Sequence, residues 1–180
     1  MDKEQSHLFW VDLEMTGLGE NQLILEVASL ITDPDLQILE TGPELVIHRS
    51  EKELRVIEEW PKIHHKKTGL LDMVQKSTIS IKSAEKLTLK FLKKWSGNNK
   101  LPLCGNSIWV DRRFIKNEMP NLEAALHYRM IDVSSIKELS SRWFGEKGLA
   151  PEKKSNHRAL DDIIESVNEL KWYKENLFKE

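Results

Sequence analysis

The sequence predicts an α/β fold in which a mixed β-sheet is covered by helices on both faces. Three apolar runs near the N-terminus are joined by short turn-bearing segments, which is typical of antiparallel strands. After these runs, apolar residues recur at three- and four-residue spacing, which is typical of amphipathic helices. Helical and strand-like segments then alternate, so we expect the later strands to be parallel.

The three N-terminal runs are expected to form an antiparallel meander. Residues 7–15 are rich in aromatic and β-branched side chains and end at the turn formed by residues 16–19. A second run covers residues 23–32 and stops at Asp33, Pro34 and Asp35. A third, residues 45–48, follows Gly42 and Pro43, and short connections of this kind favour pairing between consecutive strands.

The remaining elements alternate between helix and strand. We expect a helix with Ser83 as its N-cap and Gly97 at its end, a strand over residues 101–105, and a helix over residues 108–119 that Pro120 ends. A further strand, residues 128–133, leads into a helical region. The last helix runs to about Tyr173, Ser155 or Asn156 can cap it, and its apolar face consists of Leu160, Ile163, Ile164, Val167 and Leu170.

Length and composition predict one domain over residues 1–180, with a core at about 8–175. The single cysteine, Cys104, forms no internal disulfide and favours a reducing, cytoplasmic location. No 18-residue apolar run is present, and the N-terminus lacks the pattern of a signal peptide. We therefore expect a soluble, unprocessed protein without a membrane partner.

The charges are nearly balanced, with 27 Lys and Arg residues against 29 Asp and Glu residues and a net charge of -2. Proteins that hold long polyanions usually carry an excess of basic residues. This balance argues against long nucleic acids as partners.

Asp12 and Glu14 form the first candidate site. Residues two positions apart in a strand project from the same face, so these carboxylates lie together in an otherwise apolar stretch. Close carboxylates repel each other and are costly to desolvate unless a cation joins them. The pair therefore indicates a hard divalent metal, although an isolated pair is more often a solvated part of an edge strand.

Two further segments carry candidate groups. Asp111 lies in the first turns of a helix that follows Gly105, where a carboxylate alone is more often a stabilising charge than a ligand. His157 lies where the last helix begins and is followed by Asp161 and Asp162. The i,i+4 spacing favours Asp161 as its partner only if His157 is itself helical. A surface histidine followed by two first-turn acids is the simpler alternative.

Taken together, the three segments resemble the exonuclease motifs of the DEDD 3'-to-5' exonucleases, in their histidine-bearing branch. Within that family the similarity is greatest to members that degrade very short RNAs, and it covers about residues 8 to 175. It rests on three stretches: Trp10-Val-Asp-Leu-Glu-Met-Thr-Gly-Leu18, Cys104-Gly-Asn-Ser-Ile108 with Asp111-Arg-Arg-Phe114, and His127-Tyr-Arg-Met-Ile-Asp-Val-Ser134.

This resemblance implies a ribonuclease H-like fold, with a mixed five-stranded sheet of three antiparallel strands followed by parallel strands. It selects Asp162 over Asp161, because the family's last acid lies five residues after its histidine. Asp12, Glu14, Asp111 and Asp162 would hold two divalent cations, Mg2+ or Mn2+, with His157 as general base. The implied reaction is hydrolysis of very short RNAs, dinucleotides included, from the 3' end to nucleoside 5'-monophosphates.

The resemblance also implies the substrate contacts. Leu18 corresponds to the wedge between two bases, and Trp60 and His65 correspond to residues near the 3' base. The positions that match contacts to a 5'-phosphate are Ser107, Arg129, Ser134 and Lys137. Tyr128 matches a contact that comes from the other subunit of a homodimer.

Two alternatives stay open. An enzyme of the same branch could act on longer RNA or single-stranded DNA, although no extended basic track is evident. A noncatalytic module that binds a nucleotide or a protein is the other, but a binder gains nothing from four crowded carboxylates. Without those four acids the chain carries 25 acidic and 27 basic residues, a balance suited to a substrate with only a few phosphates.

Overall fold

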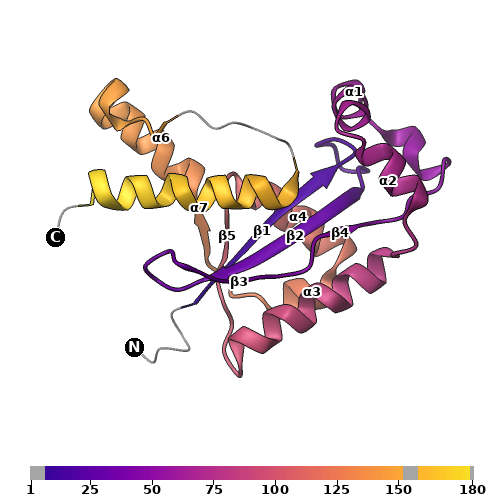
Figure 1. Ribbon diagram of the computed structural model, residues 1–180, viewed down its shortest axis with the longest axis horizontal. Helices are drawn as coiled ribbons and strands as arrows, with labels where there is room; N and C mark the ends of the chain where they lie inside the picture. The colour runs from indigo at the N-terminus through magenta and orange to yellow at the C-terminus, as the bar shows by residue number, and fades with distance from the viewer. Residues whose placement is uncertain (1–6, 152–157, 179–180) are drawn as a thin grey trace.

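A computed structural model of the protein describes residues 7–151 and 158–178. Within these residues a six-stranded sheet has the order β3-β2-β1-β5-β6, and β4 also pairs with β2 (Figure 1). The long strands β1 (Leu8–Met15) and β2 (Ile24–Thr32) are antiparallel, whereas β5 (Leu103–Gly105) is parallel to both β1 and β6 (Met130–Asp132). The expected mixed sheet, antiparallel first and parallel afterwards, is confirmed.

The edge beside β2 differs from the expected strand at residues 45–48. Two short strands, β3 (Ile38–Thr41) and β4 (Leu45–Val46), share this position, which raises the number of strands from the expected five to six. Gly42 and Pro43 interrupt them. A Cβ atom on Gly42 would lie 2.5 Å from the ring of Phe91, and a proline has no N–H to continue the ladder.

Helix α3 (Ile81–Ser96) begins earlier than expected, so the assignment of Ser83 as N-cap was wrong. Ser80 is the N-cap, and its hydroxyl oxygen accepts a hydrogen bond from the Ser83 N–H at 3.2 Å. Both serines precede the apolar face at plausible capping distance, and only the backbone angles distinguish them: Ser80 is extended, with φ -77° and ψ 158°.

The other helices connect and cover the strands. Helices α1 (Glu59–Lys67) and α2 (Leu70–Lys76) form a pair that was not predicted from the sequence, because both are short and each buries only two side chains. The remaining helices are α4 (Ile108–Glu118), α5 (Pro120–Ala125), α6 (Val133–Phe144), α7 (Ala159–Asn176) and the 3-10 helices η2 (Glu53–Val56) and η3 (Gly145–Gly148).

Two apolar cores lie on opposite faces of the sheet, as the alternation within β1 requires. Phe9, Val11 and Leu13 pack with α3, α4 and α5 on one face. Trp10 packs with α6 and α7 on the other face, where its indole N–H donates to the Thr32 hydroxyl at 3.0 Å. Helices α3 and α7 accordingly lie on opposite sides of the sheet (Figure 1), and coverage of both faces is confirmed.

Strands β1 and β5 separate after a short contact. They pair only at Phe9 with Leu103 and at Trp10 with Cys104. The carboxyl half of β1, which carries Asp12 and Glu14, therefore has no paired strand on that side within the described residues. Across residues 7–151 and 158–178, no helix combines the length and the apolar character needed to cross a membrane.

Candidate active site

Strand β1 presents both predicted acids on one face. In the β1–β2 register, Asp12 lies opposite Ala28 and Glu14 lies opposite Glu26, on the face that α7 covers. The predicted side-by-side placement of the two carboxylates therefore holds. The acids are held there by a strand whose flanking residues, Val11 and Leu13, are almost completely buried on the opposite face.

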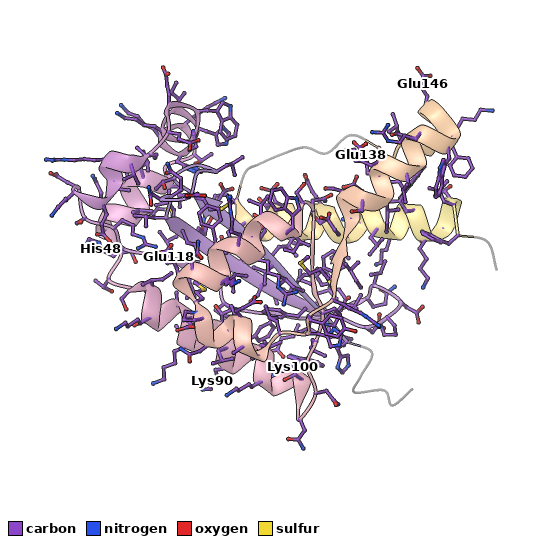
Figure 2. All side chains as sticks on the ribbon, turned by 180° about the vertical axis from the view of Figure 1, so that it is seen from behind. His48, Lys90, Lys100, Glu118, Glu138 and Glu146 are labelled. Atoms are coloured by element: carbon purple, nitrogen blue, oxygen red, sulfur yellow. The ribbon has the colours of Figure 1, made fainter. Side chains whose placement is uncertain are left out.

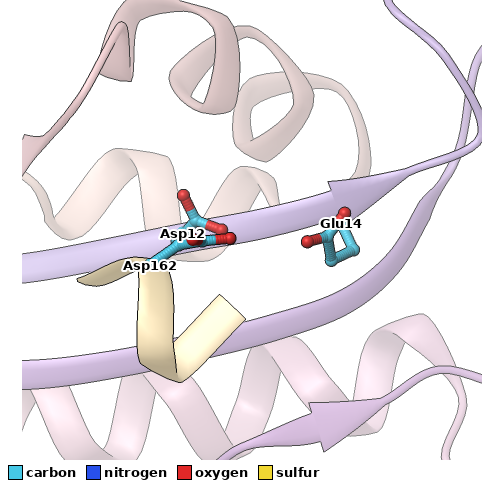
Figure 3. Close-up of side chains that lie close together, drawn as sticks. All are labelled: Asp12, Glu14 and Asp162. Carbon is cyan, nitrogen blue, oxygen red and sulfur yellow. The ribbon is translucent and has the colours of Figure 1, made fainter. Parts of the chain in front are cut away.

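Helix α7 adds a third acid. One carboxylate oxygen each from Asp12, Glu14 and Asp162 lies within 4.8 Å of the others. Figure 3 shows Asp162 reaching from the first turn of α7 toward Asp12, with Glu14 farther along β1. Asp161 is exposed and outside this cluster, so the geometry favours Asp162 over Asp161.

Burial and mutual repulsion make this cluster electrostatically unfavourable without a cation. Burial, followed by the charges of Asp162, Glu26 and Asp111, raises the pKa of Glu14 from 4.5 to about 8, against a smaller lowering by Arg158. Three converging carboxylates supply the hard oxygen ligands that Mg2+ and Mn2+ prefer. The residues present therefore fit a divalent metal.

Asp111 lies beside the cluster but does not belong to the three converging groups. It occupies the first turn of α4 and accepts a hydrogen bond from the Leu13 N–H at 3.1 Å, on the unpaired side of β1. Burial raises the pKa of Asp111 to about 7, although hydrogen bonds from backbone N–H groups lower it. The structure thus places all four predicted acids in one region, with three of them in direct convergence.

The predicted general base, His157, lies outside the described residues. Ser155 and Asn156, the predicted caps of the last helix, lie there as well. The described N-cap of α7 is Arg158, which makes no side-chain capping bond. The Ala159 N–H instead points at the carboxylate of Glu26 on β2, at 3.4 Å.

A cavity of about 310 Å³ adjoins the carboxylates. Its lining residues are Glu14, Met15, Gly17, Leu18, Glu58, Trp60, Pro61 and His65. Leu18 and Trp60 are the exposed apolar members, at 63% and 66% exposure. The cavity thus brings together the predicted wedge and both residues predicted near the 3' base.

His65 connects this cavity to the acids. It is buried, its Nε2–H donates to the Met15 carbonyl at 2.9 Å, and its Nδ1 lies 3.8 Å from Glu14. Because a carbonyl oxygen only accepts, Nε2 carries the proton. Beside it, His64 stacks on Trp60 with ring centroids 5.0 Å apart.

The residues predicted to contact a 5'-phosphate fall into two groups. Ser107 and Ser134 meet at the carboxyl ends of β5 and β6, with hydroxyl oxygens 3.2 Å apart. Lys137 joins them from α6, because its ammonium group lies 3.7 Å from Glu169, which also binds Asn106 beside these serines.

Arg129 and Tyr128 form the second group, at the amino end of β6. The Arg129 guanidinium lies over the Tyr128 ring, 5.3 Å from its centroid, and Tyr128 is 72% exposed. Arg129 lines a separate hollow with Pro102 and Lys100, the latter labelled in Figure 2. Within one chain the structure therefore does not bring Arg129 to Ser107 and Ser134.

Three residues at the site carried no predicted role. Arg113 on α4 donates to the Leu18 carbonyl at 2.5 Å and so fixes the exposed wedge. Glu26 and Arg158 pair beside the acid cluster. A sequence signal existed for Glu26, which is the only charged residue in the apolar run of residues 23–32.

Comparison with known proteins identifies the family. The exonuclease family model matches residues 9–170. Oligoribonucleases of Klebsiella pneumoniae and Escherichia coli are 47% and 46% identical to this chain over 180 residues, covering 99% of each sequence.

The fold has more distant relatives among solved structures. The Escherichia coli Exonuclease I complex with a dT13 oligonucleotide superposes with a TM-score of 0.70 at 13% identity, covering 96% of this chain and 42% of that chain. A 3'-exonuclease described in 3'-end recognition of a histone mRNA stem-loop superposes with a TM-score of 0.68 at 13% identity, covering 96% of this chain and 64% of that chain. The resemblance drawn from the three motifs is thus confirmed at the level of family and fold: the chain belongs to the oligoribonuclease family of hydrolytic exonucleases.

Proposed function

We propose that this protein hydrolyses very short RNAs, dinucleotides included, from the 3' end to nucleoside 5'-monophosphates. The observation that carries the proposal is the double position of Glu14. This residue belongs both to the carboxylate cluster and to the lining of the 310 Å³ cavity. A base held in that cavity would put its own phosphodiester next to the acids.

Divalent cations fit the acids of this site. Asp12, Glu14 and Asp162, together with Asp111, would hold two Mg2+ or Mn2+ ions. When bound, such cations lower the pKa of a water molecule and offset charge on the leaving 3'-oxygen. The protein contributes a rigid strand and a helix start that fix the ligands before substrate arrives.

His157 is proposed as the general base that takes the proton of the attacking water. Its family motif and its place immediately before Arg158 support this role, since Arg158 is anchored beside the acids. The reference pKa of a histidine, about 6.5, suits proton transfer near neutral pH.

The remaining residues of the site suit a short substrate. Leu18 and Trp60 offer apolar surfaces to bases without a hydrogen-bond code, which tolerates any sequence. Ser107, Ser134 and Lys137 would bind a 5'-phosphate. In a homodimer, the exposed Tyr128 and its neighbour Arg129 would complete the 5' pocket of the partner subunit.

A three-substrate assay tests the proposed function. The full-length protein is incubated with a 5'-phosphorylated diribonucleotide, a longer RNA and single-stranded DNA, each with Mg2+ and with a chelator. We expect the fastest hydrolysis with the diribonucleotide and none with chelator. Faster hydrolysis of longer RNA or DNA would support the alternative substrate, and no hydrolysis at all would support a binding module.

His157→Ala separates the proposed base from the metal and substrate sites. We expect a loss of about 10²- to 10⁴-fold in kcat, the usual contribution of general base catalysis, with unchanged affinity for the dinucleotide. Binding is measured by calorimetry with the variant, which turns substrate over too slowly to interfere. Turnover at the wild-type rate under saturating metal would exclude the proposed role.

A further inference from the structure

Glu26 is a completely buried carboxylate next to the acid cluster. It lies near the start of β2, is 0% exposed, and faces Glu14 directly in the antiparallel register. A second carboxylate opposite Glu14 increases the repulsion there, and it contributes to the raised pKa of Glu14. An acid at this position therefore increases the repulsion within the site unless a nearby positive charge compensates for it.

Arg158 offsets this cost by binding Glu26 with two nitrogens. Its Nη2 donates to Glu26 Oε1 at 2.6 Å, and its Nε lies 3.2 Å from both carboxylate oxygens. Such a forked pair fixes direction as well as distance, because the guanidinium is planar. A second bond from Nη2 reaches Glu44 at 2.9 Å, at the surface.

The pair also determines how α7 begins. The first helical N–H, that of Ala159, points at Glu26 at 3.4 Å, and the N-cap residue itself makes no side-chain capping bond. Arg158 accepts the Asp162 N–H through its carbonyl at 3.1 Å, which is the first backbone bond of the helix. Fixing Arg158 against β2 therefore fixes the turn that carries Asp162.

We propose that Glu26 and Arg158 are positioning residues, which lock the start of α7 onto β2 so that Asp162 converges with Asp12 and Glu14. The inference rests on the proposed function, because it assigns the cluster to divalent cations. The desolvation of a buried ion pair offsets much of its attraction, so we assign this pair a role in geometry and not in stability.

Metal binding without substrate tests the lock directly. Glu26→Gln and Arg158→Gln are titrated with Mn2+ by calorimetry, alongside the wild type. We expect Mn2+ affinity to fall by about 10- to 100-fold, the usual effect of removing a residue that orients metal ligands. With dinucleotide as substrate, kcat should fall while KM stays within about twofold, because the base cavity is untouched.

Arg49 and Glu118 supply a matched control. This ion pair is also largely buried, with the Arg49 Nη2 at 2.6 and 2.8 Å from the two Glu118 oxygens, and Glu118 also accepts the Ile24 N–H at 2.7 Å. It ties β2 to the far end of α4, labelled at Glu118 in Figure 2, and within residues 7–151 and 158–178 the hydrogen bonds and ion pairs formed by this pair do not reach α7. Arg49→Gln should lower the melting temperature and leave Mn2+ affinity unchanged.

Two further variants keep the result decisive. Glu44→Gln removes only the surface partner of Arg158 and should match the wild type in Mn2+ affinity. Arg158→Lys retains the charge without the fork, and it should recover stability more fully than metal affinity. If the Gln variants fold and bind Mn2+ as tightly as the wild type, the positioning role is wrong, whether or not RNA is hydrolysed. If the wild-type protein binds Mn2+ but hydrolyses no RNA, only the proposed function is contradicted, and the positioning role is still tested by the Mn2+ affinities of the variants.

Discussion

Glu14 is a single residue whose carboxylate is held in an electrostatically unfavourable position. Its side chain is 14% exposed and faces three other acids, and its pKa is accordingly raised to about 8. Asp111 shows the same direction of shift, to about 7. Both groups hold protons more tightly in the folded chain than in the unfolded chain. The metal-free folded state is therefore destabilised at pH values at which these carboxyl groups would ionise in the unfolded chain.

The metal-free protein should therefore lose stability as pH rises. Between the unfolded pKa of Glu14, 4.5, and its folded value of about 8, the folded state binds more protons than the unfolded state, so unfolding becomes easier with increasing pH. We expect a lower melting temperature at about pH 8 than at about pH 5 in chelator, and a flatter profile for Glu14→Gln. A scan of melting temperature against pH measures this. A melting temperature that rises with pH in the wild type would contradict the raised pKa of Glu14.

Asp161 and Asp162 form a matched pair of adjacent carboxylates. Asp162 converges on the cluster, whereas Asp161 points to solvent. Asp162→Asn should lower kcat/KM for the dinucleotide by at least about 10²-fold, or about 2.7 kcal/mol of transition-state stabilisation. Asp161→Asn should stay within about twofold of the wild type. Equal losses in the two variants would show that the geometry of this turn is misassigned.

At the scale of elements, the predicted strands and helices are those with a strong apolar period. Strands β1 and β2 and helices α3 and α7 carry such periods and were expected from sequence. Helices α1 and α2 are short and bury only two side chains each, so no long apolar period marks them in the sequence. Glu26 was not predicted as a site residue, because its partner Arg158 lies 132 residues away in sequence.

Helix α1 carries Trp60, the residue proposed to stack on a base. Trp60 protrudes from its first turn and is backed by the ring of His64, 5.0 Å away and nearly parallel. Trp60→Ala should raise KM for the dinucleotide by about 5- to 150-fold, the equivalent of about 1–3 kcal/mol of stacking, with little change in kcat. Trp143→Ala is the control, since that tryptophan is equally exposed, at 68%, and lies on α6. An unchanged KM in Trp60→Ala would show that no base of the substrate binds in this cavity.

In the whole molecule, the residues proposed to contact a 5'-phosphate lie in two separate places within one chain. Ser107 and Ser134 lie at one end of the parallel strands, and Arg129 and Tyr128 lie at the other. The family resemblance supplied all four residues and assigned only Tyr128 to the other subunit, so the separation of Arg129 from the two serines was not predicted. That separation follows from the direction of β6, because Tyr128 and Arg129 precede this strand and Ser134 follows it.

Tyr128→Ala should therefore weaken dinucleotide hydrolysis through the partner subunit, by roughly tenfold in kcat/KM, or about 1.4 kcal/mol. Mixing it with Asp162→Asn provides the sharper measurement. In a mixed dimer, the carboxylates of one subunit meet the tyrosine of the other, so activity should recover above that of either variant. Absence of recovery, or full wild-type activity in a monomeric fraction by light scattering, would place Tyr128 outside the active site.

The early separation of β1 from β5 has a consequence for observing the site. The Leu13 N–H has no strand carbonyl on that side and is held by the Asp111 carboxylate at 3.1 Å. The Asp111 side chain consequently protects this amide proton from exchange with solvent, and the same side chain would turn toward a bound cation. Its hydrogen–deuterium exchange rate therefore provides a spectroscopic reporter, inside the backbone itself, of whether Asp111 faces the strand or an ion.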